Sequence, residues 1–185
     1  MRLSVPTSAF VVLMGLGALP AQAQHDTHSS RIGTTASPYV GMEKRSVKAL
    51  SDQQIADLKA GRGMGLALDA ELNGYPGPMH VLEHASALKL SEDQRSRTKA
   101  LIEAMKAETI PIGERIIAEE VKLDRLFVDR HVTRALLETA VSRAAAAQGE
   151  LRAAHLRYHL TMIELLSPAQ IAHYAKLRGY SGGNQ

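Results

Sequence analysis

Apolar residues recur at three- and four-residue spacings along two long segments of the chain, the pattern of a helix with one buried face. In the first segment they are Leu101, Ile102, Met105, Ile112, Ile116, Leu123 and Leu126. In the second they are Leu137, Ala140, Ala144, Ala147, Leu151, His155, Met162 and Leu165. Only a short turn near residues 129–132 separates the segments, so the pattern predicts an antiparallel helical hairpin. We expect Pro111, with Gly113, to kink or break the first helix near its middle.

Three pentapeptides of one kind mark helix starts. They are Leu50-Ser51-Asp52-Gln53-Gln54, Leu90-Ser91-Glu92-Asp93-Gln94 and Leu166-Ser167-Pro168-Ala169-Gln170. Each places a Gln three residues after a Ser, which is the capping box: the Ser side chain accepts from the backbone amide of the Gln, and the Gln side chain reaches back to the Ser amide. Thr133 is a plausible N-cap for the second long helix.

Shorter helices precede the hairpin. The pattern predicts one from Asp52 to Lys59, a Gly-rich break at residues 61–63, and a second helix over about 64–72. A turn follows at residues 73–77, and Pro78 opens another helix that we expect to reach about Leu88. A hairpin with short helices at its ends buries a thin core, so a homodimer is expected.

The N-terminus has the features of an export signal. Arg2 is its only charge, residues 9–19 are apolar or Gly, and Ala21-Gln22-Ala23 forms an A-x-A cleavage site. The apolar run is shorter than the ~18–20 residues of a spanning helix. We expect residues 1–23 to be a signal peptide cleaved after Ala23. Residues 24–49 would then be a flexible polar tail, 50–180 the helical-hairpin domain and 181–185 a disordered C-terminus.

Composition agrees with an all-α protein and narrows its function. The chain has 185 residues, no Cys, no Trp and only two Phe, which excludes a disulfide scaffold and thiol chemistry. The formal charge is +3 with a pI near 9.3. Removal of Arg2 with the signal leaves a nearly balanced charge, and Lys and Arg alternate with Asp and Glu. We therefore expect no nucleic-acid partner.

Two histidine pairs are the candidate chemistry. His80 and His84 are four residues apart, as are His155 and His159, and this spacing places both rings of a pair on one face of a helix. Met162 offers a thioether and Glu103 an oxygen, so the six residues would suit Zn, Ni, Co or Cu. The alternative is that His155 is a core residue on the stripe and His159 faces solvent.

No motif of an enzyme is present in the sequence. His155 and His159 have the H-x-x-x-H spacing of zinc proteases, but Leu156 stands where the general-base Glu would be. Neither a nucleophile elbow nor a dinucleotide fingerprint occurs, and the Gly-rich run 61–65 does not follow a predicted strand. We expect no enzyme and no organic cofactor.

The L-S-x-x-Q pentapeptides resemble the L-T-x-x-Q signature of the Spy/CpxP/ZraP group of periplasmic stress proteins, with Ser in place of Thr. Residues 79–94 and 151–174 are also similar to heavy-metal resistance proteins, including the nickel/cobalt sensor CnrX. The resemblance implies an antiparallel helical hairpin that dimerises in the periplasm. Some members of the group are ATP-independent chaperones that shield unfolded clients, and others bind divalent metals and report metal stress.

The resemblance to CnrX also implies a ligand set. Its first His-x-x-x-His falls on His80 and His84, and its Glu is nearest to Glu103, one position out of register. In the last helix Met162 matches, but Tyr158 occupies the place of the His, with His159 adjacent and His155 a turn away. The sequence therefore predicts a periplasmic metal-responsive protein whose partner is a membrane signalling protein. The alternative is a chaperone whose partners are unfolded periplasmic proteins.

Overall fold

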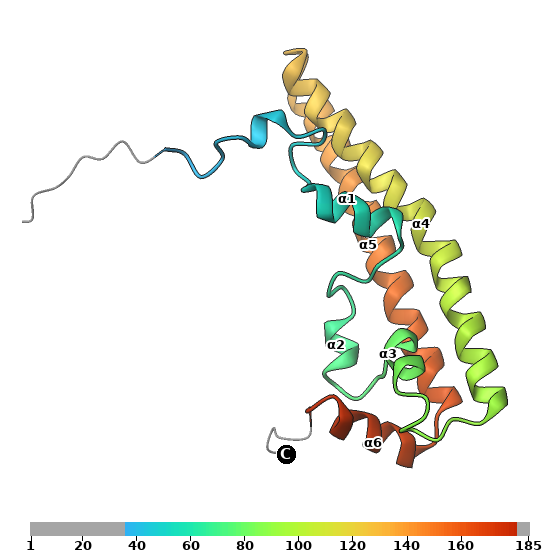
Figure 1. Ribbon diagram of the computed structural model, residues 1–185. Coiled ribbons are helices and arrows are strands. Elements are labelled where there is room, and N and C mark those ends of the chain that lie inside the picture. Colours follow the sequence, from blue (N-terminus) through green and yellow to red (C-terminus); the bar gives the residue numbers. More distant parts are fainter. Residues whose placement is uncertain (1–35, 181–185) are drawn as a thin grey trace, which may run out of the picture. The chain divides into compact units, whose positions relative to one another are not determined.

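The computed structural model describes residues 36–180, and within them the chain is all helical, with no strand. In chain order the elements are η1 (Met42–Lys44), α1 (Asp52–Lys59), α2 (Leu68–Glu71), α3 (Pro78–Glu83), α4 (Glu92–Val128), α5 (Arg134–Leu165) and α6 (Pro168–Leu177) (Figure 1). The predicted all-α fold is confirmed. The predicted signal peptide and C-terminal tail, with residues 24–35, lie outside the described residues.

The two long helices α4 and α5 form the predicted antiparallel hairpin within the compact unit that begins at Pro38. Thr133 caps α5, since its side chain accepts a hydrogen bond from the Leu136 amide at 3.3 Å. All three capping boxes are also present, at Ser51, Ser91 and Ser167, and each begins a helix at the following residue. No helix within residues 36–180 has the length and apolar character to cross a membrane.

Helix α4 continues through Pro111 for 37 residues, so the predicted break is wrong. A proline inside a helix costs about 3 kcal/mol because it removes a hydrogen bond and crowds the preceding turn. Packing opposes this cost. Ile112 and Ile116 are buried with Leu58 of α1, and Gly113 lets the Leu58 carbonyl approach α4 directly. The tertiary contacts hold the helix together where its local sequence would interrupt it.

The two helices before α4 are shorter than the sequence predicts. Helix α2 covers only four residues, because Met64 and Gly65 adopt left-handed backbone angles (φ 45° and 79°) and the chain makes turns before Leu68. Helix α3 ends at Glu83, and turns lead to Lys89, which is also left-handed (φ 51°). His84 is therefore the C-cap of α3 rather than a residue within a continuous helix.

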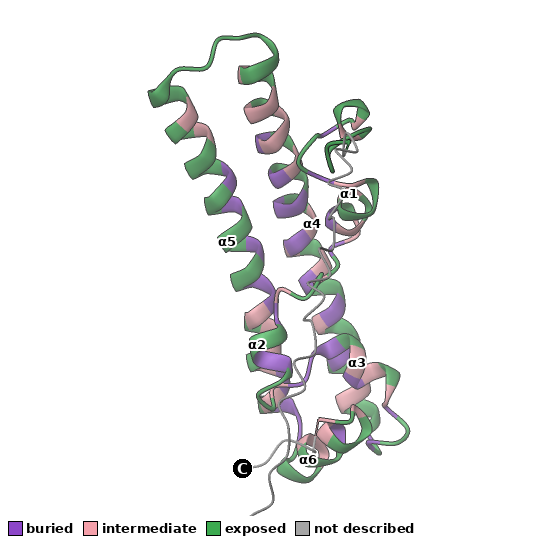
Figure 2. Cartoon of the chain, turned by 90° about the vertical axis from the view of Figure 1, so that its left-hand side faces the viewer, coloured by how far each residue is buried: buried purple, intermediate pink, exposed green. Residues whose placement is uncertain are grey.

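Buried apolar residues form two separate clusters on the hairpin. The first, here called the α1 cluster, consists of Val47, Leu50, Leu58, Ile112, Ile116, Ala147, Leu151 and Ala154. The second, the α6 cluster, consists of Val81, Ala85, Leu88, Leu90, Met162, Leu165, Leu166 and Tyr174. Figure 2 shows buried residues on the facing sides of α4 and α5. Met105 of α4 and His155 of α5 are buried but belong to neither cluster, so the hairpin is lined differently between them.

Candidate metal pocket

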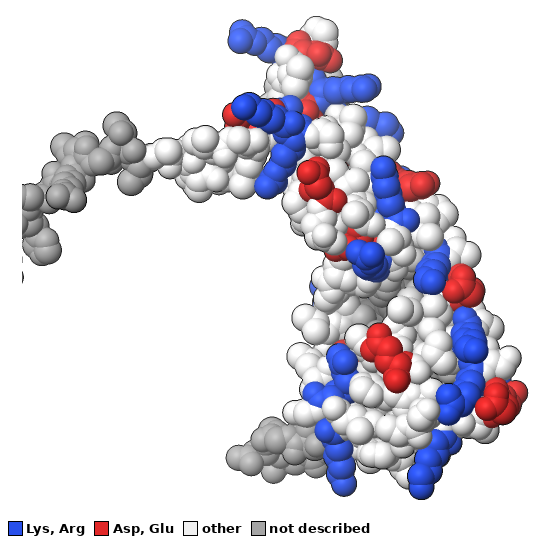
Figure 3. Space-filling view, viewed as in Figure 1, with Lys and Arg blue, Asp and Glu red and all other residues white. Residues whose placement is uncertain are grey.

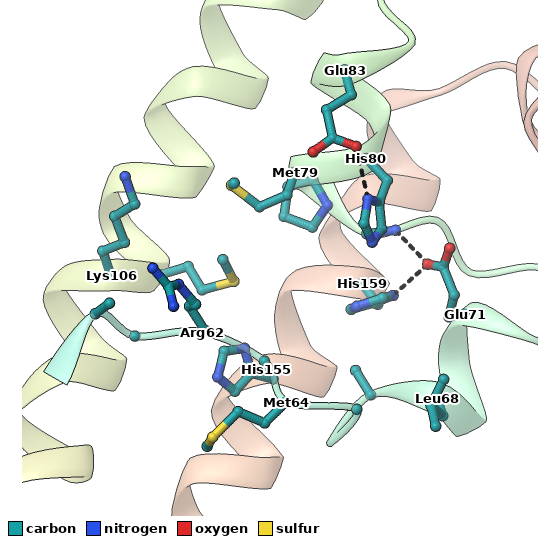
Figure 4. A pocket seen from close by; sticks show the side chains of 18 residues that line it. Arg62, Met64, Leu68, Glu71, Met79, His80, Glu83, Lys106, His155 and His159 are labelled. Carbon is teal, nitrogen blue, oxygen red and sulfur yellow. Dashed lines mark hydrogen bonds and ion pairs between the residues drawn. The ribbon is translucent and has the colours of Figure 1, made fainter. Parts of the chain in front are cut away.

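A pocket of about 560 Å³ opens where the two clusters are separated. Its walls come from the loop after α1, from α2, from the start of α3 and from one face each of α4 and α5 (Figure 4). The lining side chains that carry nitrogen, oxygen or sulfur are Arg62, Met64, Glu71, Met79, His80, Glu83, Met105, Lys106, His155 and His159. The pocket therefore collects three of the four predicted histidines and three methionines.

The Gly-rich loop 61–65 forms one wall because its glycines allow close approach. Gly61 has φ 65°, and a Cβ there would lie 2.6 Å from the Thr109 Oγ1 of α4. A Cβ at Gly63 would lie 3.7 Å from the His155 Nδ1, so the chain passes directly over the imidazole. A side chain at Gly61 would push the loop away from α4 and open this wall of the pocket.

His155 is buried in the pocket wall with one ring nitrogen unsatisfied. The residue is 3% exposed, and its Nε2 has no hydrogen-bond partner in the part of the chain that the structure describes. Burial lowers the pKa of His155 below the usual 6.5, with a smaller contribution from His159, while Glu108 opposes both. The ring is therefore neutral near pH 7 and keeps a lone pair, which is the form that binds metal ions.

His159 is held in a fixed orientation one turn further along α5. Its Nδ1 donates to the Tyr75 carbonyl oxygen at 2.7 Å, so in the neutral ring the lone pair is on Nε2. Histidines that bind metals commonly donate their other nitrogen to a carbonyl in this way. The ring fits against the chain only because residue 77 is a glycine, since a Cβ there would lie 2.9 Å from the His159 Cε1.

Glu71 lines the pocket next to His159 and is buried. Its carboxylate accepts from the Gly77 amide at 3.1 Å and from the hydroxyls of Tyr174 and Tyr180. The Arg178 Nε is 3.4 Å away. Burial, followed by the bond to Glu71, raises the pKa of Tyr174 far above its usual value, so this hydroxyl remains a donor. The carboxylate is thus engaged in linking α2 to α6.

His80 lies at the opposite rim, on α3. Its Nδ1 is 2.9 Å from the Glu83 carboxylate, and both side chains are well exposed to solvent. Figure 4 shows this pair across the pocket from His155.

The other three predicted ligands lie elsewhere. His84 packs edge-on against the Tyr174 ring, with 6.4 Å between centroids. Met162 is fully buried in the α6 cluster, and Glu103 is on the exposed face of α4, where it pairs with Lys106 at 3.2 Å. The structure thus brings together His80, His155 and His159 but not the complete CnrX-like set. Among residues 36–180, no three His, Asp or Glu side chains are arranged to hold a metal ion.

Three methionines at the pocket were not predicted as candidate ligands. Met105 belongs to the predicted apolar stripe of α4, Met64 to the Gly-rich run 61–65, and Met79 to the segment 79–94 that is similar to heavy-metal resistance proteins. Met64 and Met79 are 40% and 44% exposed, which is unusual for such side chains, whereas Met105 is buried. A methionine inside the Gly-rich run and another directly before His80 were the available signals.

Fold and pocket define an all-α helical hairpin with a His- and Met-lined cavity. A family model described as heavy-metal resistance matches residues 65–173, which is more than half of the chain. The chain belongs to this heavy-metal resistance family, within the Spy/CpxP-like all-α group, whose members are of a resistance or sensor type. Comparison with curated proteins found no match, and neither did comparison with solved structures. The predicted Spy/CpxP-like group is confirmed, whereas the CnrX-like subgroup stays a prediction. The matched residues include most of the pocket.

Proposed function

We propose that this protein is exported to the periplasm and binds there a divalent transition-metal ion, Zn, Ni, Co or Cu, as part of a response to heavy metal. The observation that carries the proposal is the buried Nε2 of His155, which lacks a partner in the described residues and lines a pocket in a protein of the heavy-metal resistance family. A buried polar atom without a partner is costly, and a bound ion would supply the missing one.

His159 and His80 would complete the imidazole set. The Nε2 of His159 retains its lone pair because Nδ1 is committed to Tyr75. The His80 side chain is 40% exposed and pairs with Glu83 at the pocket rim, so its ring can turn toward the ion without disturbing the core. Because the described nitrogen and oxygen donors are not arranged as a preformed site, binding would draw α3 toward α5. Such a movement is what a membrane signalling partner would recognise.

Titration calorimetry with each divalent ion tests the proposal. We expect one ion per chain, with an affinity that falls at least tenfold in His155→Leu and in His159→Ala. His131→Ala is the matched control, because His131 lies in the exposed turn before α5. His84→Ala distinguishes the ligand sets: it should preserve binding here and would abolish it in a CnrX-like site. Unchanged affinity in both His155→Leu and His159→Ala would overturn the proposal.

A second candidate function is that of an ATP-independent chaperone. Apolar side chains are exposed around the turn between α4 and α5, namely Phe127, Val128, Val132, Leu136 and Val141. Figure 2 shows this end of the hairpin coloured mostly as exposed. Exposed apolar patches of this kind mark sites of protein interaction. Figure 3 shows basic and acidic side chains mixed over one face of the molecule, which favours protein partners over nucleic acid.

The chaperone function predicts that the protein suppresses aggregation of an unfolded client without ATP or metal, and that Phe127→Ser weakens this effect. No suppression at a stoichiometric concentration would exclude it. The same patch is where we would place the interface of the predicted homodimer, which light scattering across a concentration series measures.

A further inference from the structure

We propose that the pocket has a soft subsite that takes Cu(I), or its redox-inert analogue Ag(I), through the Nε2 of His155 and the thioether sulfurs of Met64 and Met105, with Met79 at the rim. The inference rests on the proposed function to the extent that it uses the same pocket, and it adds a soft monovalent ion to the divalent ions proposed above.

The metal-ligating atoms that line the pocket favour a soft ion. Three thioethers line the pocket, whereas within the described residues no three His, Asp or Glu side chains are arranged for a metal. Of the two lining carboxylates, Glu71 is occupied by the Gly77 amide and two tyrosine hydroxyls, and Glu83 is paired with His80. Neutral sulfur and imidazole are the ligands that Cu(I) prefers, and hard divalent ions prefer oxygen.

Met64 and His155 lie at the same end of the pocket (Figure 4). Met64 has φ 45°, between two glycines, in a conformation that is rare for residues other than Gly, Asn and Asp. This backbone is strained for a methionine, and a glycine would adopt it without strain. The sulfur that Met64 brings to the loop beside His155 is a reason for this residue to occupy so strained a position.

Met105 supplies a second sulfur from the wall that α4 forms. It is 7% exposed on α4, and it borders the pocket without belonging to either cluster. His155, 3% exposed and with its Nε2 unpartnered among the described residues, provides the nitrogen. The imidazole and the two thioethers are all uncharged ligands. They would therefore not neutralise the positive charge of a bound ion.

Positively charged side chains at the pocket also favour a monovalent ion over a divalent one. Arg62 and Lys106 both line it, and repulsion by a fixed cation is twice as large for a divalent ion as for a monovalent one. Arg62 pairs with Asp57 and Lys106 with Glu103, so the repulsion is reduced rather than removed. The sequence contains no Cys, and thioethers, unlike thiols, do not form disulfides in an oxidising compartment.

Methyl NMR of the protein labelled at the methionine methyl groups tests the subsite without any substitution. Ag(I) is the first probe because it needs no reductant, and Cu(I) held in a competing chelator is the second. At one equivalent we expect the methyl signals of Met64 and Met105 to shift. Those of Met42 and Met162 should not shift, since neither lines the pocket. Shifts confined to Met42 or Met162 would overturn the proposal.

Leucine variants measure the sulfur contribution at nearly constant volume. Met64→Leu and Met105→Leu should each weaken Ag(I) binding at least tenfold and leave Zn(II), Ni(II) and Co(II) binding unchanged. Met162→Leu, a buried change of the same kind in the α6 cluster, should leave Ag(I) affinity unchanged.

The outcomes separate the two proposals. Divalent binding that depends on His155, together with no Ag(I) binding, would overturn the soft subsite and leave the proposed function standing. Ag(I) binding that depends on Met64 and Met105, with no binding of divalent ions, would overturn the proposed function and leave the soft subsite standing. Binding of neither class of ion would overturn both.

Discussion

Gln94 and Gln170, the final residues of two capping boxes that are 76 positions apart, hydrogen-bond to each other in both directions at 3.0 Å. Each side-chain amide nitrogen also donates to a backbone carbonyl a few residues before the other glutamine: Gln94 donates to Leu165, and Gln170 donates to Leu88. Each amide oxygen still closes its own capping box. A motif that acts locally to begin a helix therefore also joins the start of α4 to the start of α6.

This pairing predicts a difference between capping boxes. Gln94→Ala should lower the free energy of unfolding by about 1–3 kcal/mol, because it leaves part-buried polar groups without partners. Gln54→Ala is the matched control: Gln54 closes a capping box at Ser51 and is exposed, so its loss should cost less than about 1 kcal/mol. Urea unfolding measures both. The double variant Gln94→Ala/Gln170→Ala should cost less than the sum of its parts, and strict additivity would contradict the pairing.

A second prediction concerns Gly113. Alanine in place of glycine inside a helix usually stabilises it by about 1 kcal/mol. At residue 113 the added Cβ would lie 2.9 Å from the Leu58 carbonyl carbon and still closer to its oxygen. We expect Gly113→Ala to destabilise the protein by about 1–3 kcal/mol in thermal or urea unfolding. Gly149→Ala should instead stabilise it, because a Cβ there meets open space in the described structure. Stabilisation by both changes would show that α1 does not pack on Gly113.

The buried His155 predicts how stability depends on pH in the metal-free protein. Burial lowers its pKa in the folded state below the 6.5 of the unfolded chain. The unfolded chain therefore takes up the proton first as the pH falls. The contribution of neutral His155 to stability is complete above pH 6.5 and is lost progressively below it, toward the folded-state pKa. Urea midpoints at pH 7.5 and 5.5 should show this loss, and His155→Leu should reduce it. His131→Ala should retain it, and an equal pH dependence in His155→Leu would contradict the assignment.

The hydroxyl of Tyr174 gives a further prediction. It donates to the buried Glu71, and Tyr174→Phe would leave that carboxylate with one donor fewer. We expect a loss of about 1–3 kcal/mol in the free energy of unfolding. Tyr158→Phe is the control, because its hydroxyl donates to Glu108, whose side chain is 36% exposed and can be hydrated instead. The raised pKa of Tyr174 also predicts that its ring stays protonated in alkaline titrations followed by absorbance until the protein unfolds. Ionisation of all five tyrosines before unfolding would contradict it.

The sequence predicted those features of the fold that local contacts determine. The starts of α1, α4 and α6 followed from Ser and Gln three residues apart, and the hairpin followed from two apolar stripes and a short turn. The sequence did not predict that α4 continues through Pro111. Its continuity depends on Leu58 of α1, which packs against the next turn of α4. Local rules describe what a segment prefers, and they miss what a neighbour imposes on it.

The pocket was predicted only in part for the same reason. Spacing of four residues identified His155 and His159 on one helix, and both line the pocket. The spacing alone did not show that α3 ends at Glu83 and leaves His84 against Tyr174. Nor did it show that a left-handed turn brings Met64 to His155, since that depends on the path of the Gly-rich loop between helices.

The α1 cluster and the α6 cluster bury apolar residues in different halves of the hairpin, with the pocket between them. Loop 61–65 and Glu71 border the pocket, and they connect to α1 on one side and to α6 on the other. An ion that drew the loop onto α5 would make the two halves open and close as a single cooperative unit. Amide exchange in α1 and in α6 would then slow together on binding, although neither helix contacts the ion.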